Sequence, residues 1–151
     1  MLTKITKADV SQPETVEIHC HRISDEVKEI VAFVKSRQGQ LTGIVDDRQF
    51  EIFVGDVFYI ESVDNKTFIY TKSNVYETRQ KLYELEELLK NKGFLRTSKS
   101  TLLNLMKISS IQPALNGRFT AVLYSGEQTV ISRKYVPALK KALKGEAQGD
   151  L

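Results

Sequence analysis

Apolar and polar residues follow two different rhythms along the first forty residues of the chain. Residues 1–15 are largely polar and predict a loose lead-in, whereas residues 16–21 alternate apolar and polar side chains, as in a strand with one buried face. Ser24 is placed as an N-cap, and the apolar residues after it recur at the spacing of one helical face, which predicts an amphipathic helix over residues 25–36. Gly39 is a suitable stop for that helix.

From residue 41 the pattern changes to short apolar runs separated by polar turns, which is typical of antiparallel strands. The polar residues 46–49 predict a hairpin turn between the first two runs, and strands do not alternate with long helices as in a parallel sheet. One helix interrupts the strands at residues 78–92, where leucines share one side and Gly93 follows as a stop. Strands are expected at residues 41–45, 50–54, 57–62, 67–71, 74–77, 94–98, 102–106, 108–112, 119–124 and 128–132.

The last part of the chain predicts a hairpin and a closing helix. Residues 125–127, Ser-Gly-Glu, form a tight turn signal between two strands, and residues 136–143 predict a short helix before a disordered tail at 145–151. The fold class is therefore expected to be mainly β, within the α+β class. We expect one domain over residues 40–144, preceded by a strand and helix extension over residues 1–39.

Length and composition are those of an ordinary globular domain. With 151 residues, 41% of them hydrophobic and 27% charged, the chain is long enough to bury a core without disulfides or metal ions. No apolar run approaches the roughly 20 residues that a membrane-spanning helix needs, and the start lacks the apolar stretch of a secretory signal. The single cysteine, Cys20, cannot form an internal disulfide. These features predict a cytoplasmic protein.

Positive charge is concentrated in the last third of the chain, although the formal net charge is only +3. Residues 1–39 carry six basic and six acidic side chains, and residues 40–92 carry seven basic and ten acidic ones. Such a basic segment beside a near-neutral remainder is typical of a polyanion binder, but it could also be a solvated face that the acidic middle segment balances in space. Residues 93–144 have one acidic side chain, Glu127, against nine basic ones: Arg96, Lys99, Lys107, Arg118, Arg133, Lys134, Lys140, Lys141 and Lys144.

Candidate groups for catalysis or metal binding are sparse. The chain has no Gly-x-Gly-x-x-Gly, Gly-Lys-Ser/Thr or Gly-x-Ser-x-Gly motif and only two histidines, so we predict neither an enzymatic activity nor a cofactor. The His19-Cys20-His21 cluster would place both imidazoles on one face of a strand, without a third ligand nearby in sequence. A polar outer face above a buried thiol explains this cluster better than a metal site.

Two donor-rich stretches follow strands in the basic segment. Residues 96–101, Arg-Thr-Ser-Lys-Ser-Thr, come just before an apolar run, and residues 131–135, Ile-Ser-Arg-Lys-Tyr, come just before the final helix. Hydroxyl and ammonium groups in exposed loops suit contacts to DNA phosphates, and a guanidinium can grip a guanine in two places. Each stretch alone could equally be an ordinary solvated turn.

Four separated segments resemble, in the same order, the motifs of the LytTR family of DNA-binding domains. Residues 56–62, Asp-Val-Phe-Tyr-Ile-Glu-Ser, resemble the D-I-x-Y-I-E strand of the family. Residues 94–104 resemble its F-x-R-x-H-K-S-x-I-V-N segment, with Ser98 where a histidine is common. Residues 108–111 resemble the I-x-x-I element, and residues 126–135 resemble the G-x-x-I-x-I-S-R-x-Y ending.

The resemblance covers residues 41–143 and implies an elongated arrangement of small antiparallel sheets with the 78–92 helix alongside. It also implies sequence-specific binding of double-stranded DNA by a transcription regulator, which inserts loops into successive major grooves of promoter direct repeats. Carried over by position, the contacting residues would come from three loops: Asn65, Lys66 and Thr67; Ser98, Lys99 and Ser100; and Arg133 with Lys134.

Residues 1–39 are too few for the receiver domain that most family members carry. Their strand and helix resemble the extension of stand-alone members, which are often encoded beside a small membrane protein that restrains them. The extension is therefore expected either to mediate homodimerisation or contact with a membrane-bound inhibitor, or merely to complete the core. The alternative function is a protein-interaction module whose basic surface contacts an acidic or membrane-protein partner.

Overall fold

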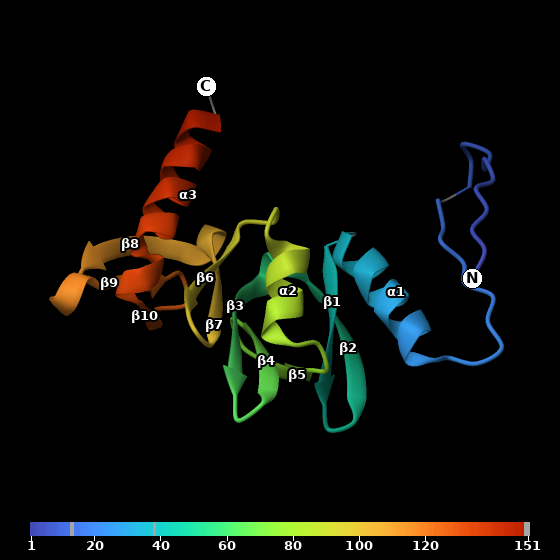
Figure 1. Ribbon diagram of the computed structural model, residues 1–151, viewed down its shortest axis with the longest axis horizontal. Helices are drawn as coiled ribbons and strands as arrows, with labels where there is room; N and C mark the ends of the chain where they lie inside the picture. The colour runs from blue at the N-terminus through green and yellow to red at the C-terminus, as the bar shows by residue number, and fades with distance from the viewer. Residues whose placement is uncertain (13, 38, 150–151) are drawn as a thin grey trace.

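The structure is a computed structural model that describes residues 1–12, 14–37 and 39–149. Within these residues, ten strands form two antiparallel sheets, accompanied by three α-helices. Figure 1 shows the parts in a row, with the N-terminal segment and then α1 at one end, the larger sheet with α2 in the middle, and the smaller sheet with α3 at the other end. The expected mainly β architecture of antiparallel sheets is confirmed, although one sheet is large, with seven strands.

The seven-stranded sheet has the order β2-β1-β5-β4-β3-β7-β6. Two of its hairpins close through two-residue turns, Asp46-Asp47 and Asp64-Asn65, in which all four residues have positive φ. Asp and Asn tolerate this conformation, and its twist suits a tight hairpin. The first turn is shorter than the predicted 46–49. The strands are β1 (Gln40–Val45), β2 (Arg48–Phe53), β3 (Val57–Val63), β4 (Lys66–Thr71), β5 (Val75–Thr78), β6 (Phe94–Ser98) and β7 (Thr101–Asn104).

The three-stranded sheet has the order β10-β9-β8, and its strands are β8 (Ile108–Pro113), β9 (Phe119–Leu123) and β10 (Gln128–Ile131). The final helix, α3 (Val136–Gly149), continues past the predicted end at residue 143 and includes most of the predicted disordered tail. Gly145 does not end it, because a single glycine costs a helix only about 1 kcal/mol relative to alanine. Residues 150–151 lie outside the described residues. Short 3-10 helices join the strands at Val54–Asp56, Leu105–Lys107, Leu115–Gly117 and Arg133–Tyr135.

The helix α1 (Asp25–Arg37) forms where the sequence predicts it. The Ser24 Oγ accepts a hydrogen bond from the Val27 backbone N–H at 3.3 Å, and Gly39 beyond the helix has a φ of 85°. The second helix, α2 (Leu82–Leu89), is shorter than the predicted 78–92, because Thr78 pairs with β4 as the last residue of β5. The sheet therefore competes successfully with the helix for that residue.

The strand predicted at residues 16–21 is wrong. These residues form no regular element, and Cys20, expected to be a buried thiol, is exposed. An alternating segment becomes a strand only when a sheet edge is free to pair with it, and residues 14–24 lie beyond α1 at the end of the molecule (Figure 1). The candidate histidine cluster thus lies on an exposed segment, where the His19 Nε2 is 3.5 Å from a Glu17 carboxylate oxygen.

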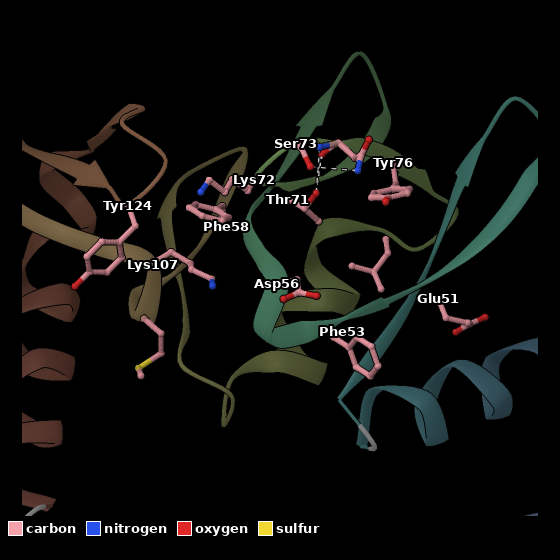
Figure 2. Close-up of a pocket in the computed structure, with 13 residues that line it drawn as sticks. Glu51, Phe53, Asp56, Phe58, Thr71, Lys72, Ser73, Tyr76, Lys107 and Tyr124 are labelled. Carbon is pink, nitrogen blue, oxygen red and sulfur yellow. Dashed lines mark hydrogen bonds between the residues drawn. The ribbon is translucent and has the colours of Figure 1, made fainter.

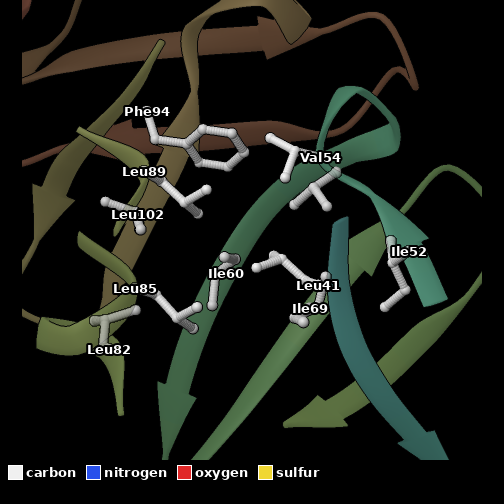
Figure 3. Close-up of a cluster of buried hydrophobic side chains, with 11 residues drawn as sticks. Leu41, Ile52, Val54, Ile60, Ile69, Leu82, Leu85, Leu89, Phe94 and Leu102 are labelled. Atoms are coloured by element: carbon white, nitrogen blue, oxygen red, sulfur yellow. The ribbon is translucent and has the colours of Figure 1, made fainter. Parts of the chain in front are cut away.

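Two hydrophobic cores hold the fold together. In the first, the predicted leucine side of α2 packs on one face of the seven-stranded sheet (Figure 3). Burying each such side chain contributes roughly 1.5–3 kcal/mol. The second core joins the sheets, because Phe58 and Leu103 of the larger sheet pack with residues of the smaller sheet and of α3. Its remaining buried members are Leu105, Ala121, Leu123, Ile131, Val136 and Leu139.

Candidate nucleic-acid interface

The β6–β7 hairpin presents the first basic turn, Ser98-Lys99-Ser100. The Ser98 Oγ accepts a hydrogen bond from the Ser100 N–H at 3.1 Å, and the Arg96 Nη1 donates to the Lys99 carbonyl at 2.7 Å. Arg96 also donates from Nη2 to a Glu86 carboxylate oxygen of α2 at 3.0 Å. These bonds fix the backbone of the turn while the Lys99 side chain stays exposed at its tip.

The β3–β4 hairpin lies beside this turn. The Ser62 N–H at the end of β3 donates to the Ser100 carbonyl at 2.8 Å, and Asn65 and Lys66 are exposed just beyond it. Thr67, the third residue predicted for this loop, is only 3% exposed. Thr67 therefore lies within β4 and not in an exposed loop, because alternation along β4 points it to the same side as the core residue Ile69.

The third turn, Arg133–Lys134, follows β10. The Ser132 N–H donates to the Thr97 carbonyl at 2.9 Å, which places this turn next to the residue that precedes Ser98. Both side chains are exposed, and the Lys134 Nζ lies 5.6 Å from the centre of the Tyr135 ring. The stem of Arg133 crosses Gly117 so closely that a Cβ on that glycine would lie 2.7 Å from the Arg133 Cδ. The structure therefore brings the other two predicted loops next to the β6–β7 hairpin, whose own turn is the third.

A shallow pocket of about 250 Å³ lies between two of these turns and the start of α2. Asn65 and Lys99 line it together with Arg96, which belongs to the donor-rich stretch 96–101, and with Lys81 and Tyr83, which the sequence did not predict as contacts. The predicted 78–92 helix placed Lys81 and Tyr83 inside a long helix, where nothing marked them. The available signal was that the hydrogen-bond donors Lys81 and Tyr83 lie close to the start of a helix. Only the fold shows that they line the same pocket as Lys99.

The acidic residue of the basic segment is held away from these turns. The Tyr59 hydroxyl donates a hydrogen bond to the Glu127 carboxylate at 2.9 Å, and its ring stacks on Tyr70 with 4.3 Å between centroids. Burial, and then the bond to Glu127, raises the pKa of Tyr59 well above its usual value. Glu127 precedes β10, whereas Arg133 follows it, so the carboxylate and the guanidinium belong to opposite ends of that strand.

A larger cavity of about 560 Å³ lies at the opposite end of the strands, beside the β4–β5 turn (Figure 2). Its charged lining is balanced between the lysines Lys72 and Lys107 and the carboxylates Glu51 and Asp56. None of the predicted contact residues lines it. Among the described residues, no group of three or more His, Cys, Asp or Glu side chains could hold a metal ion, and no helix is long and apolar enough to cross a membrane.

Antiparallel sheets that present basic, hydroxyl-rich turns side by side suit a β-rich DNA-binding domain. The chain belongs to the LytTr DNA-binding domain family, whose model matches residues 47–144. A solved LytTr DNA-binding domain, from a protein described as a methyl-accepting/DNA response regulator of Bacillus cereus, superposes with a TM-score of 0.66. It is 26% identical, and the match covers 70% of this chain and 96% of that domain.

Curated relatives agree with this assignment. The chain is 26% identical over 151 residues to the sensory transduction protein LytT of Bacillus cereus, a match that covers 95% of this chain and 54% of that protein. It is 27% identical over 130 residues to an uncharacterized HTH-type transcriptional regulator of Staphylococcus aureus, covering 85% of this chain and 88% of that protein. The chain thus spans about half the length of the first relative and most of the second. DNA binding in transcription regulation is the function that this family membership supports.

Proposed function

We propose that the protein is a transcription regulator that binds specific double-stranded DNA in the cytoplasm and inserts its loops into successive major grooves of promoter direct repeats. The observation that carries this proposal is the pair of backbone hydrogen bonds, Ser62 to Ser100 and Ser132 to Thr97, which hold two basic turns against the β6–β7 hairpin, whose own turn is the third. Binding energy then comes from contacts made by preset turns, with little ordering cost on association.

The turns differ in the chemistry they offer. Arg133 carries a planar guanidinium that can donate two parallel hydrogen bonds to the O6 and N7 of a guanine, so we assign it the base contact. Lys66, Lys99 and Lys134 are point charges that suit phosphates and release counterions. Ser98, Ser100 and Asn65 add hydrogen bonds to the DNA backbone. Thr67, being buried, is left out of this set.

The test is binding of the purified protein to labelled DNA from its own upstream region, with an excess of unrelated duplex as competitor. We expect competitor-resistant binding at physiological salt. Arg133→Ala should cost roughly 1–3 kcal/mol and relax the sequence preference, whereas Lys99→Ala should weaken binding evenly across sequences. Arg22→Ala is the matched control, because Arg22 is exposed and lies outside the region that matches the family. Binding that unrelated duplex erases would overturn the proposal.

A second function, contact with a protein partner, is favoured by the segment before α1. Leu2, Ile5, Val10, Val16 and Ile23 are each at least 64% exposed. Exposed apolar side chains of this kind suit a second copy of the chain or a membrane-bound inhibitor. Deletion of residues 1–23 should therefore change the oligomeric mass measured by light scattering, or abolish capture of the inhibitor, without changing DNA affinity. An unchanged mass and unchanged capture would contradict this role.

A further inference from the structure

We infer that the pocket between the β3–β4 turn, the β6–β7 turn and the start of α2 holds one phosphodiester group of the DNA backbone, with Lys81 and Tyr83 as contacts outside the three predicted loops. The inference rests on the proposed DNA binding and names a further part of its surface. Its groups come from three elements: Ser62 and Asn65, Lys81 and Tyr83, and Arg96 with Lys99.

The charges in the pocket favour an anion. Arg96 is neutralised by Glu86 at 3.0 Å, but the ammonium groups of Lys81 and Lys99 leave an excess of positive charge among the lining residues. Another carboxylate of the helix, that of Glu84, is engaged with the backbone, because its Oε1 accepts a hydrogen bond from the Lys81 N–H at 3.1 Å. Two lysines from separate elements can therefore face one phosphate.

The hydrogen-bonding groups and the volume of the pocket indicate that its ligand is a small oxyanion. The Tyr83 hydroxyl, the Ser62 hydroxyl and the Asn65 amide are donors of the kind that bind phosphate oxygens in protein–DNA complexes. A volume of about 250 Å³ is below the roughly 300–1,000 Å³ of sites for small organic molecules. The pocket therefore suits a single phosphate group better than a whole metabolite.

The pocket is also preformed. The Ser62 N–H to Ser100 carbonyl bond joins its two turns at 2.8 Å, and the Arg96 Nη1 holds the Lys99 carbonyl at 2.7 Å. Arg96 is thus a positioning residue for the turn, and buried Thr67 forms part of the floor. Because these turns are the ones proposed to enter a groove, a backbone phosphate at the groove edge is the oxyanion that reaches this place.

The experiment measures affinity for specific and unrelated duplexes by fluorescence anisotropy at several salt concentrations. Lys81→Gln should weaken binding to both duplexes by the same factor and lower the slope of log affinity against log salt by about 0.9, the value for one lost phosphate contact. Lys81→Arg should retain the slope. Lys72→Gln, a lysine at the other end of β4 in the larger cavity, is the matched control and should change nothing.

Tyr83→Phe is a second variant, needed in case Lys81→Gln disturbs the start of α2. It removes only a hydroxyl, from a side chain that is 68% exposed, so the fold should be unaffected. It should lower affinity for both duplexes severalfold with an unchanged salt slope. Wild-type binding with normal slopes in Lys81→Gln, and normal affinity in Tyr83→Phe, would overturn the phosphate site alone. Absence of specific binding by the wild type would instead overturn the proposed function. Stabilisation by inorganic phosphate beyond chloride at equal ionic strength, with unchanged DNA slopes, would assign the pocket to a free anion and overturn it too.

Discussion

At the scale of single residues, the position of Arg133 depends on the absence of a side chain at Gly117. Gly117 has a φ of 75°, and an added Cβ would lie 2.7 Å from the Cδ and 3.0 Å from the Cγ of Arg133. These are stem atoms, so Gly117→Ala must turn the whole arginine away. We expect Gly117→Ala to reduce the ratio of affinities for promoter and unrelated duplex in the same direction as Arg133→Ala, and the competition assay measures that ratio.

Gly126→Ala separates this effect from backbone strain. Gly126 also has a positive φ, 91°, but an added Cβ would meet nothing within 4 Å. Both substitutions incur the left-handed penalty of about 1–2 kcal/mol in stability, but only Gly117→Ala displaces Arg133. An equal loss of specificity in the two variants would show that Arg133 does not depend on its packing over Gly117.

A buried amide makes a second prediction at this scale. The Asn104 Nδ2 donates to the Val57 carbonyl at 2.8 Å, and its Oδ1 accepts from the Met106 N–H at 3.1 Å. Asn104 is 3% exposed, so Asn104→Ala leaves two polar groups unpaired and should lower the free energy of unfolding by about 1–3 kcal/mol. Urea denaturation measures this loss. The exposed Asn91 is the control, and a comparable loss on Asn91→Ala would refute the argument.

At the scale of elements, local patterns predicted the strands and the helix faces well, but pairing partners were beyond them. The leucine side of α2 and the strand β6 follow from periodicity, since each is set by residues close in sequence. That β1 pairs with β5, and β3 with β7, depends on contacts between distant residues, which periodicity does not encode. The wrong prediction of a strand at residues 16–21 has the same cause, because the alternating pattern does not show whether a sheet edge is available for the segment to pair with.

The candidate site, too, has residues that the sequence predicted and residues that only the fold brings together. The motif positions of Lys99 and Arg133 were predicted, and the structure presents both on exposed turns. Thr67 was expected in an exposed loop because the loop residues were carried over from the family by position. That assignment does not take into account the side to which each residue of β4 points. Lys81 was missed because it joins Lys99 only through the packing of α2 on the sheet.

The β1–β2 hairpin joins the rest of the described sheet through β5. β1 and β5 share the single residue pair Ile44 and Glu77, and an added Cβ on Gly43 would lie 2.5 Å from the Cβ of Tyr76. Gly43→Ala should push the hairpin away and lower stability by about 1–3 kcal/mol, as overpacking does. Hydrogen exchange of β1 and β2 amides should rise more than that of β3.

Gly55→Ala is the control for this junction. Gly55 does not have a positive φ, and an added Cβ would meet no atom within 4 Å. It should leave both stability and exchange unchanged. Faster exchange spread evenly over the whole sheet in Gly43→Ala would contradict a local detachment of the hairpin.

At the scale of the whole molecule, the relative position of the two sheets sets the distance between the turns proposed to read DNA. Lys99 belongs to a hairpin of the seven-stranded sheet, whereas Arg133 follows a strand of the three-stranded sheet. The second core and the hydrogen bond from Tyr59 to Glu127 cross between the sheets. The spacing of the turns is therefore a property of the packed protein and of neither sheet alone.

Leu103 tests whether the sheets form one cooperative unit. It lies in β7 of the larger sheet, is fully buried, and packs with residues of the smaller sheet, so Leu103→Ala should lower the free energy of unfolding by about 2–5 kcal/mol. Because the lost contacts belong to both sheets, slow exchange of β4 and β9 amides should accelerate by the same factor. Leu115→Ala, at a side chain that is 84% exposed, should leave both unchanged. Faster exchange in β9 with unchanged exchange in β4 would mean that the smaller sheet opens by itself, and the distance between Lys99 and Arg133 would then not be fixed before DNA binds.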